Sequence, residues 1–239
     1  MSELRDLVID AHGGKKRWDE ISSLDIDMSG TGLLWGMKGW HDVLKDVGVE
    51  IDTKKQMVRY RRFTDPRESC IYRPDHAAIE TLEGLTLEER SDPRASFQDH
   101  TVQTKWDKLD LAYFSGYAIW NYLNAPFFFL LPGVETAEIE PWDEQGERRR
   151  RLRVRFPTSV ATHCPEQTFH INDEGLIGRL DYRVSITAGL PMAHYLSEYE
   201  DFGGIKIATK RRSYRQNPDG SASPEPLIVG LDITAVRVQ

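Results

Sequence analysis

Three histidines in the C-terminal half are the residues whose chemistry could be catalytic. His163, His170 and His194 lie in neighbouring segments with strand-like alternation, where imidazoles could converge as metal ligands or as a general base. An odd number of positions separates His163 from His170, so a regular strand would place them on opposite faces. Pro165 can break that regularity, and convergence of the three histidines therefore stays open as an alternative.

The adjacent pair His163–Cys164 suggests a thiol activated by an imidazole. Adjacent strand residues point to opposite faces, whereas a nucleophilic cysteine needs its base within hydrogen-bond reach. We therefore expect no thiol catalysis. The sequence contains no GxSxG, HExxH, P-loop or dinucleotide-binding motif, so we expect neither a cofactor nor a metal, and the balance favours a protein without catalysis.

An uncharged stretch from Leu111 to Val134 holds the residues best suited to bind an apolar ligand, in a chain of which 29% is charged. Leaving its aromatic surface in water would cost about 25 cal/mol per Å². Ligand pockets are mostly apolar with a few polar groups, a mixture that tyrosine, tryptophan and asparagine supply. We predict a ligand-binding set consisting of Trp106, Tyr113, Tyr117, Trp120, Asn121, Tyr122, Phe128 and His194.

The same stretch can also be read simply as the core helix of the fold. Apolar residues cover nearly all sides of a helix drawn through residues 106–123, which is typical of a buried helix. The uncharged length reaches the roughly 20 residues that span a bilayer, but Pro126 disfavours helix at Ala125. We expect a buried helix, a break and a second apolar segment, and no integral membrane segment.

Segments with strand patterns flank this stretch on both sides. Leu24, Ile26 and Met28 alternate with polar residues, which is typical of a half-buried strand. Before the central helix we expect strands at 24–35 (with 33–35 continuing past a bulge), 43–51, 57–63, 68–72, 76–82 and 85–90. After it we expect strands at 134–139, 148–156, 167–172, 176–187, 192–202, 205–214 and 227–238. Short turns without intervening helices indicate an antiparallel meander.

These elements predict an α+β, β-rich fold in a single domain over residues 1–239. Helical spacing of apolar residues from Leu4 to Ala11 adds an N-terminal helix, for which Ser2 is a candidate N-cap. A sheet of this many strands curls or closes. We expect a single curved antiparallel sheet, an incomplete β-barrel, wrapped around the central apolar helix.

Charge and cysteine content bear on partners and compartment. The net charge of −7 argues against a nucleic-acid partner, and we expect the basic runs at 148–151 and 210–212 to be solvated strand faces.

The N-terminus and the cysteines bear on the cellular compartment. Residues 1–14 are charged from Glu3 onward and lack the apolar run of a signal peptide. Cys70 and Cys164 fit no metal or redox spacing, and two reduced thiols favour a cytoplasmic protein.

Three groups of motifs together resemble a family of uncharacterised bacterial proteins over nearly the whole chain. They are AHGGKKRW at 11–18, YFSGYAIWNYLNAPF at 113–127, and DYRVSI, AHY and GGIKIATKRR between 181 and 212. More distantly, the helix–Gly-Gly–strand opening and the GIKIATKRR strand look like bacterial lipoprotein carriers of the LolA type. That resemblance implies an incomplete barrel around helices with an apolar cavity for acyl chains. Those carriers are exported with a signal peptide, which we do not expect in this chain.

The favoured function is therefore the binding or carrying of a hydrophobic small molecule or lipid-like ligand in an apolar cavity, without catalysis. One alternative is an enzyme using the same cavity, with His163, His170 or His194 as base or metal ligand. Another is a protein–protein interaction module that uses an open sheet edge. The sequence determines neither the oligomeric state nor whether the interior is filled.

Overall fold

A computed structural model describes residues 3–144 and 146–239, so the candidate N-cap Ser2 lies outside the described residues. The first half contains α1 (Glu3–Ala11), α2 (Gly14–Glu20), β1 (Ser23–Thr31), α3 (Leu33–Lys38), β2 (Val47–Asp52), β3 (Val58–Arg61), β4 (Glu68–Arg73), β5 (His76–Thr81), β6 (Thr86–Ser91) and η1 (Ala95–Phe97). The second contains α4 (Lys108–Asn124), η2 (Phe127–Leu130), β7 (Glu135–Glu144), β8 (Glu147–Arg155), β9 (Glu166–Ile171), β10 (Ile177–Val184), η3 (Ser185–Thr187), β11 (Leu190–Phe202), β12 (Ile205–Arg215) and β13 (Val229–Val238).

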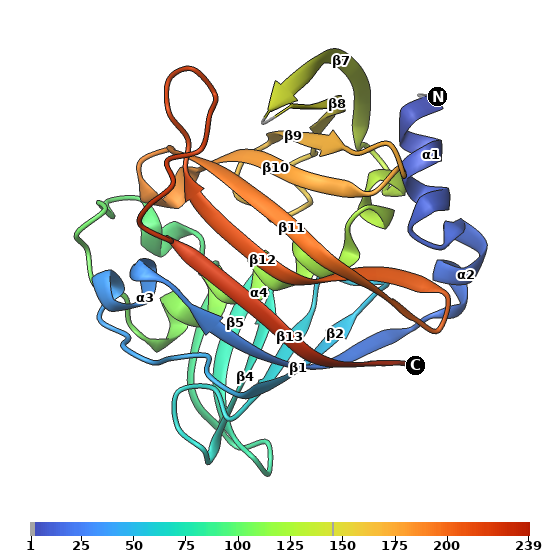
Figure 1. Ribbon diagram of the computed structural model, residues 1–239. Helices are drawn as coiled ribbons and strands as arrows, with labels where there is room; N and C mark the ends of the chain where they lie inside the picture. The colour runs from blue at the N-terminus through green and yellow to red at the C-terminus, as the bar shows by residue number, and fades with distance from the viewer. Residues whose placement is uncertain (1–2, 145) are drawn as a thin grey trace.

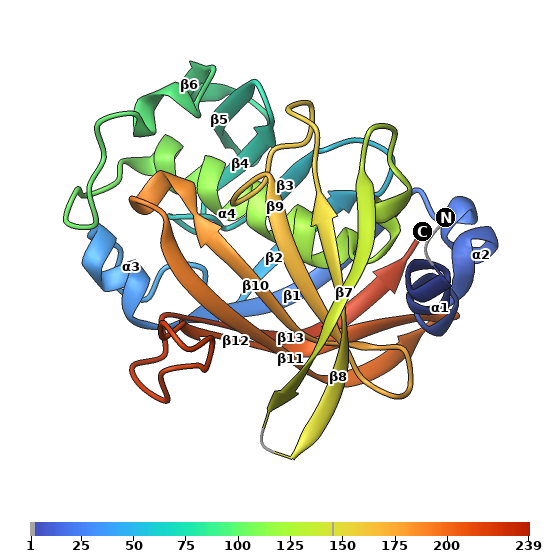
Figure 2. The same ribbon diagram turned by 90° about the horizontal axis from the view of Figure 1, so that it is seen from above.

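Thirteen strands form one antiparallel sheet in the order β6-β5-β4-β3-β2-β1-β13-β12-β11-β10-β9-β8-β7. Every neighbour is consecutive in the chain except β1 and β13, which join the two halves. Figures 1 and 2 show the sheet curling around α4, while β6 and β7 remain its two ends in the described part of the chain. The predicted incomplete barrel around a central helix is confirmed.

Helix α4 is the buried element around which the sheet curls. Asp107 caps its N-terminus by accepting from the backbone N–H of Asp110 (2.8 Å), whose carboxylate accepts in return from the backbone of Asp107 (3.2 Å). Every residue from Leu109 to Asn124 is buried. The helix stops before Pro126, as predicted, and a short 3-10 turn follows. Within the described residues, no helix is long and apolar enough to cross a membrane.

The two sides of α4 are packed with different tightness. A Cβ atom on Gly116 would lie 2.3 Å from Cβ of Tyr72 in β4, so only glycine allows this close approach. At the C-terminal end, Trp18 of α2 stacks on Phe127 of η2, with ring centroids 4.3 Å apart. The side that faces β10, β11 and β13 is instead bordered by a small cavity.

Two predicted strand boundaries are wrong near the N-terminus. Residues 33–35 form the start of α3 and not a continuation of β1, because Gly32 adopts a positive φ of 109° and turns the chain. The turn lets Trp35 fold back and donate from its indole nitrogen to the carbonyl of Thr31 (2.9 Å). The strand expected over 43–51 begins only at Val47, since Asp42, Leu44 and Asp46 have positive φ angles that interrupt an extended chain.

Candidate functional site

A small cavity lies between α4 and the inner face of the sheet, where β1, β13, β10 and β11 approach α3. Its volume is about 60 Å³. The apolar lining comes from both halves of the chain and includes Met28, Leu34, Trp35, Phe114, Ile119, Val184, Met192 and Leu231. The polar lining groups are Tyr60, Ser115, Tyr122, His163, Tyr182 and Thr187. Apolar walls with a few polar groups are typical of a ligand site, but such sites are usually about 300–1,000 Å³.

A buried hydrogen-bond network forms one wall of the cavity. The hydroxyls of Tyr117 and Tyr122 contact Nδ1 and Nε2 of His163, each at 3.0 Å. The hydroxyl of Tyr122 also meets that of Tyr182 (3.3 Å), which reaches Nδ1 of His194 (3.4 Å). His163 stacks on the ring of Tyr182 with centroids 4.3 Å apart. Both nitrogens of His163 are therefore engaged, one as donor and the other as acceptor.

The network is electrically neutral at physiological pH. Burial, followed by the positive charge of Arg94, lowers the pKa of His163 to about 3. Burial and then Arg211 hold the pKa of His194 well below its usual value. Burial also raises the pKa of Tyr122 well above 10. General acid–base catalysis works best with a pKa near the operating pH, so these groups are suited to hydrogen bonding and not to proton transfer.

Three of the sequence-predicted ligand-binding residues come together at this site. Tyr122 lines the cavity, and Tyr117 and His194 belong to the network behind it. Trp120 instead points to the turn after β2, where its indole N–H donates to the carbonyls of Asp52 (2.9 Å) and Lys55 (2.8 Å).

The other predicted ligand-binding residues do not line the cavity. The amide of Asn121 donates to the carbonyls of Tyr117 (2.6 Å) and Ala161 (2.9 Å). Trp106 packs against Phe114, the hydroxyl of Tyr113 accepts from Arg94 (3.4 Å), and Phe128 packs on Phe156. These contacts hold α4, the loop before it and η2 in place.

Two residues important to the cavity were missed as binding residues. Tyr60 and Tyr182 lie at buried positions of β3 and β10, and both line the cavity. A tyrosine on the apolar face of an alternating strand was the signal that could have identified them, because a buried phenol needs a polar partner.

The basic run at 210–212 was expected to be solvated, and this is wrong for Arg211. Its side chain lies on the inner face of β12 and is only 4% exposed, whereas Lys210 and Arg212 are partly exposed. The alternation of the strand explains the difference, because the middle residue of the run points inward.

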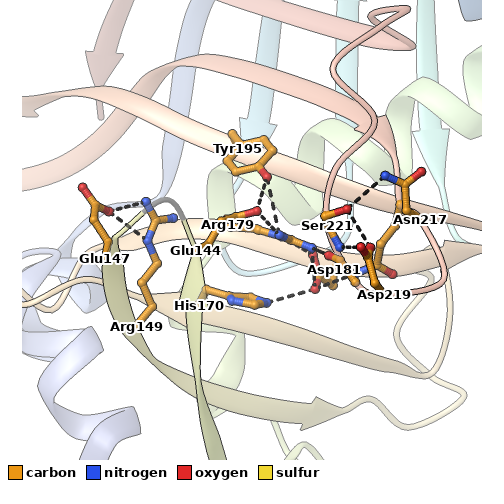
Figure 3. Close-up of polar contacts among 12 residues, drawn as sticks. Glu144, Glu147, Arg149, His170, Arg179, Asp181, Tyr195, Asn217, Asp219 and Ser221 are labelled. Atoms are coloured by element: carbon orange, nitrogen blue, oxygen red, sulfur yellow. Dashed lines mark hydrogen bonds and ion pairs between the residues drawn. The ribbon is translucent and has the colours of Figure 1, made fainter.

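His170 lies on the opposite, outer face of the sheet, in a second polar cluster (Figure 3). Its Nε2 meets a carboxylate oxygen of Asp181 at 2.9 Å. Arg179 is fully buried between Asp181 (2.6 Å) and Glu144 (2.5 Å), and the hydroxyl of Tyr195 donates to Glu144 (2.7 Å).

The three histidines therefore do not converge. His163 and His194 belong to the inner network, whereas His170 belongs to the outer cluster. Across residues 3–144 and 146–239, no group of three or more potential ligand side chains is arranged to hold a metal. Cys164 donates to the carbonyl of Glu166 (2.9 Å) and makes no hydrogen bond with His163.

The sequence matches no protein-family model and no curated protein. Among solved structures, it is similar to a putative outer membrane lipoprotein-sorting protein domain from Vibrio parahaemolyticus (TM-score 0.54, 10% identity, covering 99% of this chain and 91% of that one). The chain has the fold of that domain. A LolA superfamily protein from Nitrosomonas europaea is also similar (TM-score 0.49, 9% identity, covering 97% and 92%). The fold implied by the distant resemblance to lipoprotein carriers is confirmed, and membership of an uncharacterised bacterial family stays a prediction.

The expectation of a cytoplasmic protein is wrong. The finding that overturns it is the fold shared over nearly the full length with an outer membrane lipoprotein-sorting domain. The cysteine argument also fails physically, because Cys70 and Cys164 are buried and burial raises the pKa of both thiols. Buried thiols of this kind are inert, so their reduced state does not report the compartment.

Proposed function

We propose that this protein binds and carries a hydrophobic small molecule or lipid-like ligand between α4 and the inner face of the sheet, without catalysis. The observation that carries the proposal is the apolar cavity with a neutral hydrogen-bonding wall made of Tyr122, His163 and Tyr182. The fold likeness to a lipoprotein-sorting domain supports it further. Tyr122, Tyr117 and His194 retain their proposed roles in ligand binding.

The hydroxyl of Tyr60 offers an additional contact for a ligand. Tyr60 lines the cavity and is fully buried, and its hydroxyl has no hydrogen-bond partner among the described residues. The Ser115 hydroxyl lies near it without reaching hydrogen-bond geometry, and donates instead to the carbonyl of Leu111 (2.7 Å). Leaving a buried polar group unpaired costs about 1–3 kcal/mol, and a polar atom of a ligand would remove that cost.

Binding requires the cavity to enlarge, because about 60 Å³ is far below the volume of a typical ligand site. The part of the wall best suited to move is α3 with the following turn, which contributes Leu34, Trp35 and Leu44. This helix has only six residues. Its start is held to the sheet by backbone bonds that include Leu34 N–H to the carbonyl of Ile228 (3.0 Å). Outward movement of α3 would widen the cavity.

Native mass spectrometry of protein purified from cells tests this function. We expect a mass above that of the polypeptide, which organic extraction removes, and displacement of a fluorescent fatty acid by the extract. A polypeptide mass alone, together with no fatty-acid binding, would refute the proposal.

A matched pair of variants locates the site. Ala118→Leu adds volume on the cavity side of α4 with a good helix-forming residue, and we expect it to reduce ligand binding. Ala137→Leu in β7 makes the same chemical change away from the cavity and serves as the control. Equal binding by both variants would place the ligand elsewhere.

We also propose that residues 1–239 form a single domain, since one sheet and one hydrophobic cluster include elements from both halves of the chain. Coincident urea unfolding transitions followed by tryptophan fluorescence and by far-ultraviolet circular dichroism are expected. Two separate transitions would contradict it.

A further inference from the structure

Arg211 is a buried cation inside the half-barrel without an acidic partner. It projects from the inner face of β12 and is 4% exposed. Among the described residues it forms no ion pair, whereas the next residue, Arg212, pairs with Asp232 at 2.6 Å on the other face. Arginine stays protonated in proteins, so a full positive charge is enclosed next to the ligand site.

The protein satisfies only part of the hydrogen-bonding capacity of Arg211. The Nη2 of Arg211 donates to the carbonyl of Tyr122 (2.7 Å) in the last turn of α4. The guanidinium lies 5.2 Å from the centroid of the Tyr122 ring. The negative end of the α4 dipole compensates roughly half a charge. The Nε of Arg211 is buried and has no partner among the described residues.

A second buried nitrogen without a partner among the described residues lies beside the same ring, and it is a donor in the tautomer in which the Tyr182 hydroxyl donates to Nδ1 of His194. His194 is 1% exposed, and its ring meets Tyr122 edge-on with centroids 4.6 Å apart. Its Nδ1 lies 3.4 Å from the hydroxyl of Tyr182, whereas Nε2 has no partner among the described residues. The Arg211 charge contributes to the lowered pKa of His194, which agrees with the two groups being close.

The surroundings of this donor pair are otherwise uncharged. The nearby His12 is neutral, because burial is the main cause that lowers its pKa to about 4 and Arg211 adds to the effect. Tyr199 and Tyr182 also face Arg211 and remain protonated, since burial raises the pKa of both hydroxyls. One arginine with a neutral imidazole matches a single negative charge, and the planar guanidinium fork matches a carboxylate.

We infer that Arg211 and His194 bind the carboxylate of an amphiphilic ligand whose apolar part occupies the cavity between α4 and the sheet. Tyr122 connects the two regions, because it lines the cavity and its ring is flanked by both donors. The inference rests on the proposed function and adds the ligand class, which is a free acid and not an esterified acyl chain.

Binding of oleate and methyl oleate to the full chain tests the inference, because the two probes differ only in the charged head. We expect oleate to bind wild type about tenfold or more tightly than the ester, the factor typical of hydrogen bonds to a charged group. Arg211→Met should remove this preference and leave the affinity for methyl oleate unchanged. Arg211→Lys should retain part of the preference, because it keeps the charge without the fork.

His194→Leu is the second test, since it removes the other donor without removing the charge. We expect the preference for oleate to fall severalfold. Thermal unfolding of each variant separates a binding role from a structural one, and Arg211→Met should not lower the melting temperature. Equal binding of both probes to wild type, or a lowered melting temperature with loss of both probes in Arg211→Met, would overturn the inference. If neither oleate nor methyl oleate binds wild type, the proposed function itself is refuted.

Discussion

Two buried arginines project from opposite faces of the same curved sheet and differ in their partners. Arg179 on the outer face is fully buried and lies between the carboxylates of Asp181 (2.6 Å) and Glu144 (2.5 Å) (Figure 3). Arg211 on the inner face is nearly as buried, but it has one carbonyl and one aromatic ring as partners. Carboxylates from two strands neutralise the first charge, whereas the second keeps a buried N–H without a partner among the described residues.

The histidines repeat this contrast. His170 on the outer face contacts Asp181, whereas the ring nitrogens of His163 and His194, on the inner side, hydrogen-bond only to tyrosine hydroxyls among the described residues. A buried face without carboxylates cannot stabilise a protonated imidazole. The inner face therefore favours neutral hydrogen bonding and the outer face favours ion pairing, although both belong to the same sheet.

The largest expected effect comes from removing the paired arginine. Arg179→Met leaves the partly buried carboxylates of Glu144 and Asp181, whose side chains are 11% and 16% exposed, without their cation. We expect the free energy of unfolding to fall by about 3–5 kcal/mol. Arg211→Met removes an unpaired charge of similar burial and should change the free energy of unfolding by less than about 1 kcal/mol or increase it. Urea unfolding measures both. If both variants lose the same free energy of unfolding, the paired and the unpaired arginine do not differ in their contribution to stability.

We expect acid pH to lower the free energy of unfolding by a smaller amount, because the buried inner histidines bind protons only when the chain unfolds. The pKa of His163 is lowered to about 3 in the folded state, from 6.5. Between these values the unfolded chain binds more protons, so stability falls as the pH falls below 6.5. Between pH 7 and pH 5 this histidine alone should account for a loss of about 2 kcal/mol.

His163→Gln should remove this loss of about 2 kcal/mol in the free energy of unfolding between pH 7 and pH 5. Urea unfolding at the two pH values measures it. An Asp173→Asn variant in the turn between β9 and β10 serves as a control that leaves the buried histidines in place. An unchanged pH dependence in His163→Gln would show that this imidazole is already protonated or is open to solvent in the folded protein.

The smallest effect is expected at Tyr60, in a comparison of one hydroxyl from each face. Tyr195→Phe removes a hydroxyl that donates to Glu144, and we expect a loss of about 1.5–3 kcal/mol, typical of hydrogen bonds to charged groups. Tyr60→Phe removes a buried hydroxyl that has no partner among the described residues, so it should leave the stability of the ligand-free protein unchanged or raise it by up to about 1–3 kcal/mol. If Tyr60→Phe is as destabilising as Tyr195→Phe, the inner hydroxyl is not reserved for a ligand.

Much of the architecture could be predicted from local patterns. The alternation of Leu24, Ile26 and Met28 recurs as the buried face of β1, and the uncharged run through Pro126 recurs as α4 and η2. Helix α3 was missed because the apolar run at 33–35 has no periodicity that separates helix from strand. The turn at Gly32 decides between them: its φ is 109°, and a Cβ atom there would lie only 2.5 Å from the carbonyl oxygen of Ile228, a residue distant in the sequence.

The candidate site was less accessible to prediction. Tyr122, Tyr117 and His194, which the structure brings to the cavity, are polar aromatic residues in apolar surroundings, and this local character is the basis of their prediction as binding residues. Trp120 has the same local character, yet its indole N–H donates to backbone carbonyls of Asp52 and Lys55 after β2 and does not face the cavity. Local sequence describes what a side chain needs, but it does not show which backbone or side chain supplies it.

The sequence by itself determined that α4 is buried and that strands follow one another as an antiparallel meander. These properties depend on periodicity and transfer free energy, which act over a few residues. Only the tertiary structure decided which buried arginine is paired. Arg179 meets Glu144 because β7 and β8 bring that residue onto the outer face, whereas Arg211 faces the end of α4 across the interior. Such pairing depends on how a curved sheet brings distant segments together, and that arrangement has no local signature.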